Sequence, residues 1–373
     1  MSEVNGSCDK RFQAVRDTLA ESLRDRDVGA SAAVFVDGEP VADLWGGYAD
    51  AARAVPWQRD TVVNVWSVSK TMLALCALVL ADRGVLDLDA PVGRHWPEFA
   101  AAGKENVLVR HVLAHTAGLP HLDGMVSEED LYDWPAVTAR LAAQAPRWKP
   151  GTQAGYHSLT QGFLLGEVIR RVTGRRPGAF FAQEVAGPLG ADFQFTLSPA
   201  DDGRFAAGIA PPGAPADWGS APSPSAVATG TGAGEDGAPA GIRLAVANTP
   251  AWRRAEIPSG SGYGNARSVA AVQSVLASGG TVRGVRLLSP EGCALASQEQ
   301  YRGIDQVTGA SVRYGMGYGI FDPQVGWAGW GGSMVMTDPD ARMTVAYTMN
   351  QMLDSGYDRG LAIVLAAYDG LGS

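Results

Sequence analysis

The chain has 373 residues, of which 46% are hydrophobic and 18% charged, so it can bury a full globular core and is too apolar to be disordered. At about 150 residues per domain, this length predicts two or three structural units. The 30 basic and 39 acidic residues leave a net charge of −9. This is the wrong sign for holding nucleic acid or an acidic membrane surface, so neither partner is expected.

The cysteines and the apolar segments indicate the compartment. Cys8, Cys76 and Cys293 are odd in number and show no Cys-x-x-Cys spacing, so they indicate neither a disulfide framework nor a zinc site. The longest apolar run, residues 72–81, is shorter than the roughly 18 residues needed to cross a bilayer. Residues 1–12 lack the apolar core of a signal peptide. We therefore predict a cytoplasmic protein without a membrane partner.

The N-terminal part predicts a helix followed by a hairpin. Apolar side chains recur at helical spacing over residues 9–26, which indicates an amphipathic helix. Two runs rich in β-branched and aromatic residues, 32–36 and 41–45, then flank Asp37-Gly38. An Asp-Gly pair between such runs is a strong hairpin signal.

The C-terminal part repeats these elements in the reverse order. Residues 333–337 and 343–349 flank the turn 338–341, which predicts a second hairpin, and a helix is expected over 357–368. We therefore predict an α/β (α+β) fold in which both chain ends build one antiparallel sheet flanked by helices.

The middle of the chain is predicted to be mostly helical. Helices are expected over residues 107–114, 133–143 and 159–172. Residues 209–241 are dominated by Pro, Gly, Ala and Ser and are predicted to form a long surface loop or lid. A glycine pattern at 232–237 inside this loop follows no strand, so it does not indicate a dinucleotide site.

These elements divide the chain into two predicted domains. Residues 1–90 and 255–373 are assigned to a discontinuous sheet domain, and residues 91–254 to a mostly helical domain. The active site is expected between them.

One lysine stands out from the others. Lys10, Lys104 and Lys149 lie in polar or loop-like sequence, where an ammonium group is expected to stay hydrated, whereas Lys70 opens an apolar helix. Desolvation lowers the pKa of a lysine towards a useful range for a base. Ser67 lies three residues earlier, so both side chains can share one face of the helix N-terminus.

A serine three residues before a lysine is a weak pattern by itself. Ser7 and Lys10 form a second copy on the polar N-terminus, where nothing would desolvate the amine. The competing interpretation of Ser67 and Lys70 is a helix N-cap followed by a solvated lysine in the first turn.

Four blocks in order carry a family resemblance. They are Ser67-Val68-Ser69-Lys70, His111 to Leu119, Pro150-Gly151-Thr152 with Tyr156-His157-Ser158, and Gly329-Trp330-Gly331-Gly332-Ser333. Together they resemble the serine β-lactamase and penicillin-binding-protein superfamily. The likeness runs from about residue 32 to residue 350 and is strongest to the class C branch, the family VIII carboxylesterases and related acyltransferases.

The resemblance implies a β-lactamase/transpeptidase-like fold and a set of roles. Ser67 would be the nucleophile, Lys70 its activating base and Tyr156 the group that exchanges protons with the serine and the leaving group. Backbone N–H groups of Ser67 and Trp330 would form the oxyanion hole. No metal ion and no organic cofactor is implied.

The chain departs from the family pattern where a substrate would bind. Ser158 stands where the tyrosine motif commonly ends in Asn, and Trp327-Ala328-Gly329 replaces a strand start that is usually Lys or His. A tryptophan offers an apolar wall and one N–H donor instead of a cation. The exchange argues against efficient β-lactam hydrolysis. We predict substrate contacts from Ser158, Trp327 and Gly329, and one from His157.

Other catalytic patterns are set aside. No Gly-x-Ser-x-Gly elbow is present, so an α/β-hydrolase is not indicated. His111 and His115 have the spacing of two zinc ligands, but Val112 stands where a zinc protease has Glu. This pair is interpreted as a helix end followed by a turn.

The sequence thus predicts a serine esterase that acts on a small-molecule ester or amide through an acyl-enzyme on Ser67. An alternative is an acyltransferase of secondary metabolism, in which an amine or alcohol reaches the acyl-enzyme before water. A third hypothesis is a non-catalytic binding protein that keeps the fold. The oligomeric state is not predicted.

Overall fold

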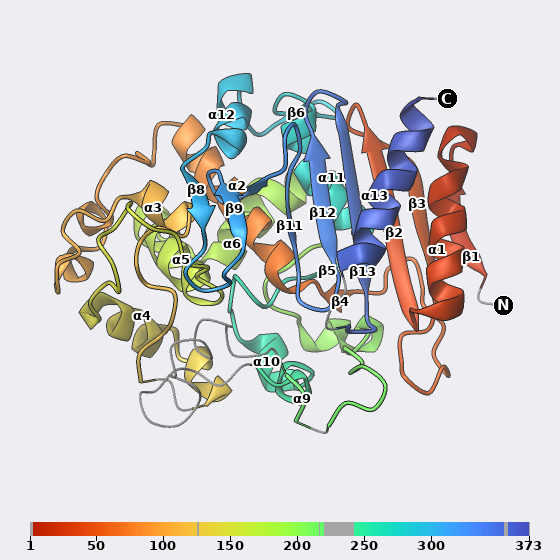
Figure 1. The fold of residues 1–373 in the computed structure, drawn as a ribbon, viewed down its shortest axis with the longest axis horizontal. Helices are drawn as coiled ribbons and strands as arrows, with labels where there is room; N and C mark the ends of the chain where they lie inside the picture. The colour runs from red at the N-terminus through yellow and green to blue at the C-terminus, as the bar shows by residue number, and fades with distance from the viewer. Residues whose placement is uncertain (1–2, 125–126, 216, 220–241, 354–356, 373) are drawn as a thin grey trace.

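The computed structural model describes residues 3–124, 127–215, 217–219, 242–353 and 357–372. Its centre is an antiparallel sheet of nine strands in the order β1-β3-β2-β13-β12-β11-β10-β9-β8 (Figure 1). The strands are β1 (Val4–Cys8), β2 (Gly29–Val36), β3 (Glu39–Gly47), β8 (Tyr301–Ile304), β9 (Ser311–Tyr314), β10 (Gly319–Ile320), β11 (Val325–Ala328), β12 (Met334–Asp338) and β13 (Met343–Met349). Strands of the two chain ends, β2 and β13, pair directly, which confirms the predicted sheet.

Two short ladders lie outside the large sheet. They are β4 (Val63–Asn64) with β5 (Tyr263–Gly264), and β6 (Thr281–Val282) with β7 (Val285–Arg286). The first ladder leads directly into the segment that carries Ser67.

Helices cover both faces of the sheet. Figure 1 shows α1 (Gln13–Asp25) and α13 (Tyr357–Leu371) side by side in front of the strands and α11 (Ala266–Ala277) behind them. Almost every side chain of β2 is buried, as expected for a strand that is covered on both faces. The predicted helix over 9–26 is shorter, because a 3₁₀ turn (Lys10–Phe12) precedes it.

The predicted middle helices are present with adjusted ends. The helices beyond the sheet are α2 (Ser69–Asp82), α3 (Val109–Leu113), α4 (Trp134–Ala143), α5 (Thr160–Thr173), α6 (Pro177–Phe181), α7 (Gly187–Leu189), α9 (Leu244–Ala247), α10 (Pro250–Arg254) and α12 (Pro290–Ala294). Asp133 caps α4 by accepting the Ala136 N–H, and Gly174 ends α5 in the left-handed region with φ of +72°.

Single-turn helical segments connect these elements. The 3₁₀ turns are η2 (Trp66–Val68), η3 (Val92–Arg94), η4 (Pro97–Ala100), η5 (Glu128–Tyr132), η7 (Pro199–Arg204) and η8 (Leu295–Ser297), and η6 (Ala182–Ala186) is a π-helical turn. The helix α2 is buried on every side from Ser69 to Leu80, so its first turn, which holds Lys70, enters the core. No helix in the described ranges is long and apolar enough to cross a membrane.

One strand was not predicted, and two sequence predictions are not fully tested by the structure. The polar start of the chain forms the edge strand β1, which was not predicted. In the predicted loop 209–241, residue 216 and residues 220–241, including the glycine pattern, lie outside the described residues, while Ile209 donates its N–H to Asn350 O at 2.7 Å. The domain boundaries at 90/91 and 254/255 stay a prediction.

The prediction for Lys104 was wrong. This residue was predicted to be hydrated, but its side chain is completely buried. Its Nζ donates to the carbonyl oxygens of Ala101 at 2.9 Å and Ala142 at 3.0 Å, and also to that of Gln144. A cation suits this place because Ala142 lies in the last turn of α4 and Gln144 is its C-cap, where backbone carbonyls lack helical partners.

Candidate active site

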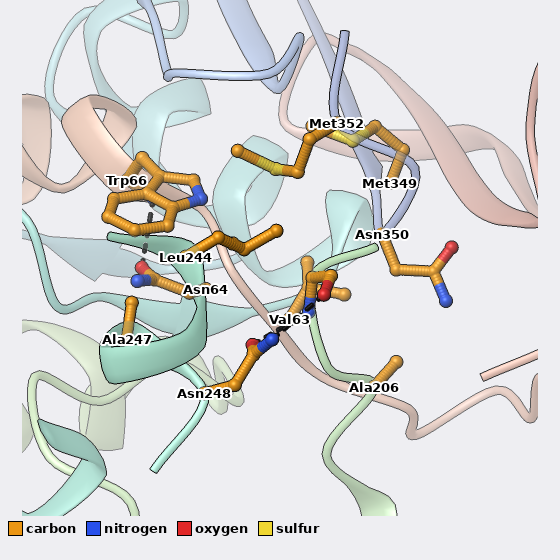
Figure 2. Close-up of a pocket in the computed structure, with 11 residues that line it drawn as sticks. Val63, Asn64, Trp66, Ala206, Leu244, Ala247, Asn248, Met349, Asn350 and Met352 are labelled. Carbon is orange, nitrogen blue, oxygen red and sulfur yellow. Dashed lines mark hydrogen bonds between the residues drawn. The ribbon is translucent and has the colours of Figure 1, made fainter. Parts of the chain in front are cut away.

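Ser67 lies in a strained turn between β4 and α2. The preceding residue, Trp66, has φ of +53°, a conformation that bulky residues rarely adopt. Figure 2 shows how the turn is held: Asn64 Oδ1 accepts the Trp66 N–H at 3.0 Å, and the indole lies near Leu244 and Met352. The Trp66 ring also contacts Trp330, with centroids 4.6 Å apart. Strain of this kind is characteristic of functional sites.

The Ser67 hydroxyl lies between an amine and a phenol. Lys70 Nζ is 3.0 Å from Ser67 Oγ, and the Tyr156 hydroxyl donates to the same oxygen at 2.6 Å. The Lys70 nitrogen lies 4.8 Å from the centre of the Tyr156 ring. The structure therefore brings together the three residues that the sequence singled out for catalysis.

Lys70 is buried with backbone carbonyls as its other partners. Its side chain is 1% exposed, and Nζ lies 2.7 Å from Ser158 O and 3.1 Å from Ser259 O. In the described ranges the hydrogen-bond partners of Nζ are these two carbonyls and the Ser67 hydroxyl, with no carboxylate among them. Desolvation lowers the pKa of Lys70 well below its usual range. A neutral amine has two N–H groups for the two carbonyls and a lone pair for the Ser67 proton.

The pKa of Tyr156 is shifted in the direction opposite to that of Lys70. Desolvation raises the pKa of its phenol, which outweighs the hydrogen bond to Ser67. At neutral pH the phenol therefore holds its proton, while Lys70 is prepared to accept one.

Several contacts that hold Tyr156 in place were not predicted from the sequence. Asp305 Oδ1 accepts the Tyr156 N–H at 3.1 Å, and Oδ2 accepts the Tyr314 hydroxyl at 3.0 Å. The buried His115 ring meets the Tyr156 ring edge-on, with centroids 5.1 Å apart. His115 belongs to one of the four blocks and could have been considered there, whereas Asp305 carries no signal in the sequence.

His157 has a different role from the predicted substrate contact. Its side chain is completely buried, Nε2 accepts the Leu119 N–H at 3.0 Å, and Nδ1 donates to Gly155 O at 2.6 Å. Burial lowers the pKa of His157 to about 4, so the ring is neutral and links two backbone segments. The neighbouring Ser158 has an exposed side chain, and its carbonyl holds Lys70.

The paired histidines are also structural. His111 Nδ1 accepts the Leu108 N–H at 3.2 Å, so this ring caps α3. His115 Nδ1 accepts the His157 N–H at 3.1 Å. Both contacts agree with the interpretation of this block as a helix end followed by a turn. No cluster of three or more His, Cys, Asp or Glu side chains suited to a metal occurs in the described part of the chain.

The end of β11 lies very close to the turn between β4 and α2 that carries Ser67, which is called the nucleophile turn below. A Cβ on Gly329 would lie 2.2 Å from Val65 O, so only glycine fits there. Trp327, two residues earlier, stacks on Tyr156 with centroids 5.8 Å apart. Trp330, which follows Gly329, packs between Trp66 and Trp218. Among the described residues, no backbone acceptor is bonded to the Trp330 N–H.

The comparisons with known proteins agree with this arrangement. A crystal structure of a family VIII carboxylesterase is 38% identical, with a TM-score of 0.89 and 99% and 100% of the two chains covered. A penicillin-binding-protein homologue from Caulobacter crescentus is 34% identical, with a TM-score of 0.86 and the same coverage. Esterase/beta-lactamase LipL from Mycobacterium tuberculosis (strain ATCC 25618 / H37Rv) is 35% identical over 361 residues, which cover 94% of this chain and 83% of LipL.

Fold and relatives define a serine hydrolase of the β-lactamase-like superfamily. A sequence model of the family described as Beta-lactamase matches residues 15–368, and the chain therefore belongs to the beta-lactamase family.

Proposed function

We propose that this hydrolase is a carboxylesterase that acts on neutral esters, with Ser67, Lys70 and Tyr156 as its catalytic residues. The observation that carries the proposal is the position of Ser67 Oγ, 3.0 Å from the buried amine and 2.6 Å from the phenol. The relatives support esterase activity, since LipL is named an esterase/beta-lactamase and the 38% identical structure is named a family VIII carboxylesterase.

The acylation step follows from the two opposite pKa shifts. Neutral Lys70 takes the Ser67 proton as Oγ attacks the ester carbonyl. The N–H groups of Ser67 and Trp330 stabilise the negative oxygen of the tetrahedral intermediate. Tyr156 then gives its proton to the leaving alkoxide, so that an alcohol departs. The acyl-enzyme is left with a Lys70 cation beside a Tyr156 phenolate, and each favours the charged form of the other.

Deacylation reverses these proton transfers. The Tyr156 phenolate takes a proton from water, and the resulting hydroxide attacks the acyl carbonyl. Ser67 leaves and recovers its proton from Lys70. The products are one alcohol and one acid, and all three side chains regain their starting protonation states. The cycle uses only groups of this chain and water, with a covalent ester on Ser67 as its intermediate.

The residues around the cluster favour a neutral substrate. Trp327 stands where a cation would bind a carboxylate, and it stacks on Tyr156 and on Tyr314. A substrate beside this strand meets aromatic faces, which suit an apolar acyl or alcohol group. We propose that Trp327, Gly329 and the exposed Ser158 contact the substrate.

Hydrolysis of p-nitrophenyl butyrate, compared with that of a chromogenic cephalosporin, tests this function. The protein should release nitrophenol with a kcat/KM at least about a hundredfold above that for the cephalosporin, because a missing charge-assisted contact costs several kcal/mol across a binding site. Ser67→Ala should abolish ester turnover, whereas Ser297→Ala, an exposed serine elsewhere, should leave it unchanged. Undiminished turnover by Ser67→Ala would refute the proposal. Adding a primary amine to the assay and measuring amide separates hydrolysis from acyl transfer.

We also propose a cytoplasmic location. Cys8, Cys76 and Cys293 are free thiols, and free cysteines are common where the surroundings are reducing. Fractionation of the source cells followed by immunodetection tests this, and recovery in the secreted fraction would overturn it.

A further inference from the structure

The turn that follows β11 is held by the beginning of α13. Arg359 Nη2 donates to Gly331 O at 2.5 Å and to Gln351 O at 3.0 Å. The helix also packs closely there, since a Cβ on Gly360 would lie 2.8 Å from the Met334 side chain. Gly331, the residue after Trp330, is therefore held by the first turn of α13.

Arg359 is itself fixed by a buried carboxylate. Asp27, between α1 and β2, accepts hydrogen bonds from Arg359 Nη1, from Ser22 Oγ at 2.5 Å and from the Tyr347 hydroxyl. The side chains of Arg359 and Asp27 are 1% and 0% exposed. A buried ion pair is weak evidence for stability, because apolar side chains of the same size often serve as well. Its directional hydrogen bonds, in contrast, give it a defined geometry.

A continuous packed path connects this pair to the nucleophile. Gly331 has φ of +87°, and a Cβ there would lie 2.4 Å from Met352 Sδ. Met352 lies near the Trp66 ring in Figure 2. The Trp66 ring contacts the Trp330 ring, and Ser67 is the next residue after Trp66. The turn 329–332 and the nucleophile turn thus share one set of contacts.

We propose that Asp27 and Arg359 are positioning residues for the oxyanion hole: they hold the turn 329–332 so that the Trp330 N–H points at the carbonyl oxygen attacked by Ser67. This inference rests on the proposed function, which makes that N–H an oxyanion donor. The pair acts through Gly331 and touches no substrate. Its effect should therefore appear in the tetrahedral transition state and be absent from ground-state binding.

Kinetics of Arg359→Gln and Asp27→Asn test the inference. Losing an oxyanion donor costs roughly 10²–10³ in kcat, and displacing it by a fraction of an ångström should cost part of that, about 10- to 100-fold. KM should change less than about threefold, because ground-state contacts remain. The rate of inactivation by a p-nitrophenyl phosphonate, which becomes tetrahedral on Ser67, should fall by the same factor as kcat/KM.

Two further variants separate positioning from stability. Glu167→Gln removes a carboxylate that is 2% exposed and bonded to Arg170 and Arg171 in α5, so it should lower the melting temperature while kcat stays unchanged. Arg359→Lys keeps the cation opposite Asp27 but loses the planar fork that reaches two carbonyls. Arg359→Lys should fold and show a kcat between those of the wild type and Arg359→Gln. If Arg359→Gln is insoluble, the kcat of Arg359→Lys alone tests whether Arg359 positions the oxyanion hole.

The inference is overturned if the folded Arg359 variants keep the wild-type kcat and phosphonate rate. Failure of the proposed function has a different signature, because the wild-type protein would then neither turn over the ester nor react with the phosphonate.

Discussion

A methyl group added at Gly329 should slow catalysis while leaving the protein folded. The Cβ of Gly329→Ala would lie 2.2 Å from Val65 O, whereas real Cβ contacts stay beyond 3.0 Å. The end of β11 must therefore move away from the nucleophile turn by about 0.8 Å. Gly329 does not have a positive φ, so alanine adds no backbone strain there and the effect is purely steric.

The size of the effect follows from this displacement. A shift of about 1 Å in a catalytic group can cost 10²-fold in rate, so we expect kcat for p-nitrophenyl butyrate to fall about 30- to 100-fold. Overpacking at a buried position costs about 1–3 kcal/mol, which should leave the protein folded at 25 °C.

Steady-state kinetics and thermal unfolding should be measured together on Gly329→Ala and on a control. Gly203→Ala is matched, because a Cβ there meets nothing within 4 Å, and it should behave as the wild type. A Gly329→Ala protein with the wild-type kcat would refute the reasoning, since it would show that the approach of β11 to Val65 does not matter for turnover.

Three other substitutions or conditions have defined outcomes. Desolvation lowers the pKa of Lys70, so kcat/KM should rise with pH up to that lowered pKa and level off above it; folding stability should rise from the lowered pKa to the usual lysine pKa, because only over that window does the unfolded chain bind more protons than the folded one. A stopped assay from pH 5 to 10 tests the sign for kcat/KM, and urea titrations over the same pH range test the sign for stability. A flat profile in either measurement contradicts the corresponding prediction. Lys104→Met leaves three carbonyls, two of them in buried hydrogen bonds, without their donor and should lower the free energy of unfolding by about 2–4 kcal/mol in urea titrations, with unchanged kcat; a change below about 0.5 kcal/mol would contradict this. Trp327→Lys should raise kcat/KM for an ester that carries a free carboxylate at least about tenfold relative to the neutral ester, and an unchanged ratio would show that this position does not face the substrate.

The sequence predicted the parts of the site that depend on local spacing. Ser67 and Lys70 are one helical turn apart, so their contact follows from helix geometry alone. The strands β2, β3, β12 and β13 carry β-branched and aromatic runs around short turns, and these were found where expected. Tyr156 could be placed only through the family resemblance, because it lies 89 residues from its partner Ser67.

Contacts made by the backbone or over long distances could not be predicted. The carbonyl groups of Ser158 and Ser259 that hold Lys70 have no side-chain signature. Lys104 was assigned to solvent because its neighbours are polar, yet its amine is held by the nearby carbonyl of Ala101 and by two carbonyls about 40 residues away, those of Ala142 and Gln144. His157 was predicted as a substrate contact, but its ring is completely buried and is bonded to the backbone of Leu119 and Gly155, partners that carry no side-chain signature.

The most direct test of the catalytic cluster is the mass of the protein during turnover. Wild-type protein mixed with excess p-nitrophenyl ester and quenched in acid within milliseconds should carry one acyl group per chain, and peptide mapping should place it on Ser67. Tyr156→Phe, which loses the donor to the leaving group, should accumulate the same ester at least about a hundredfold more slowly. An acyl group on another residue, or nitrophenol release without any covalent adduct, would contradict the account.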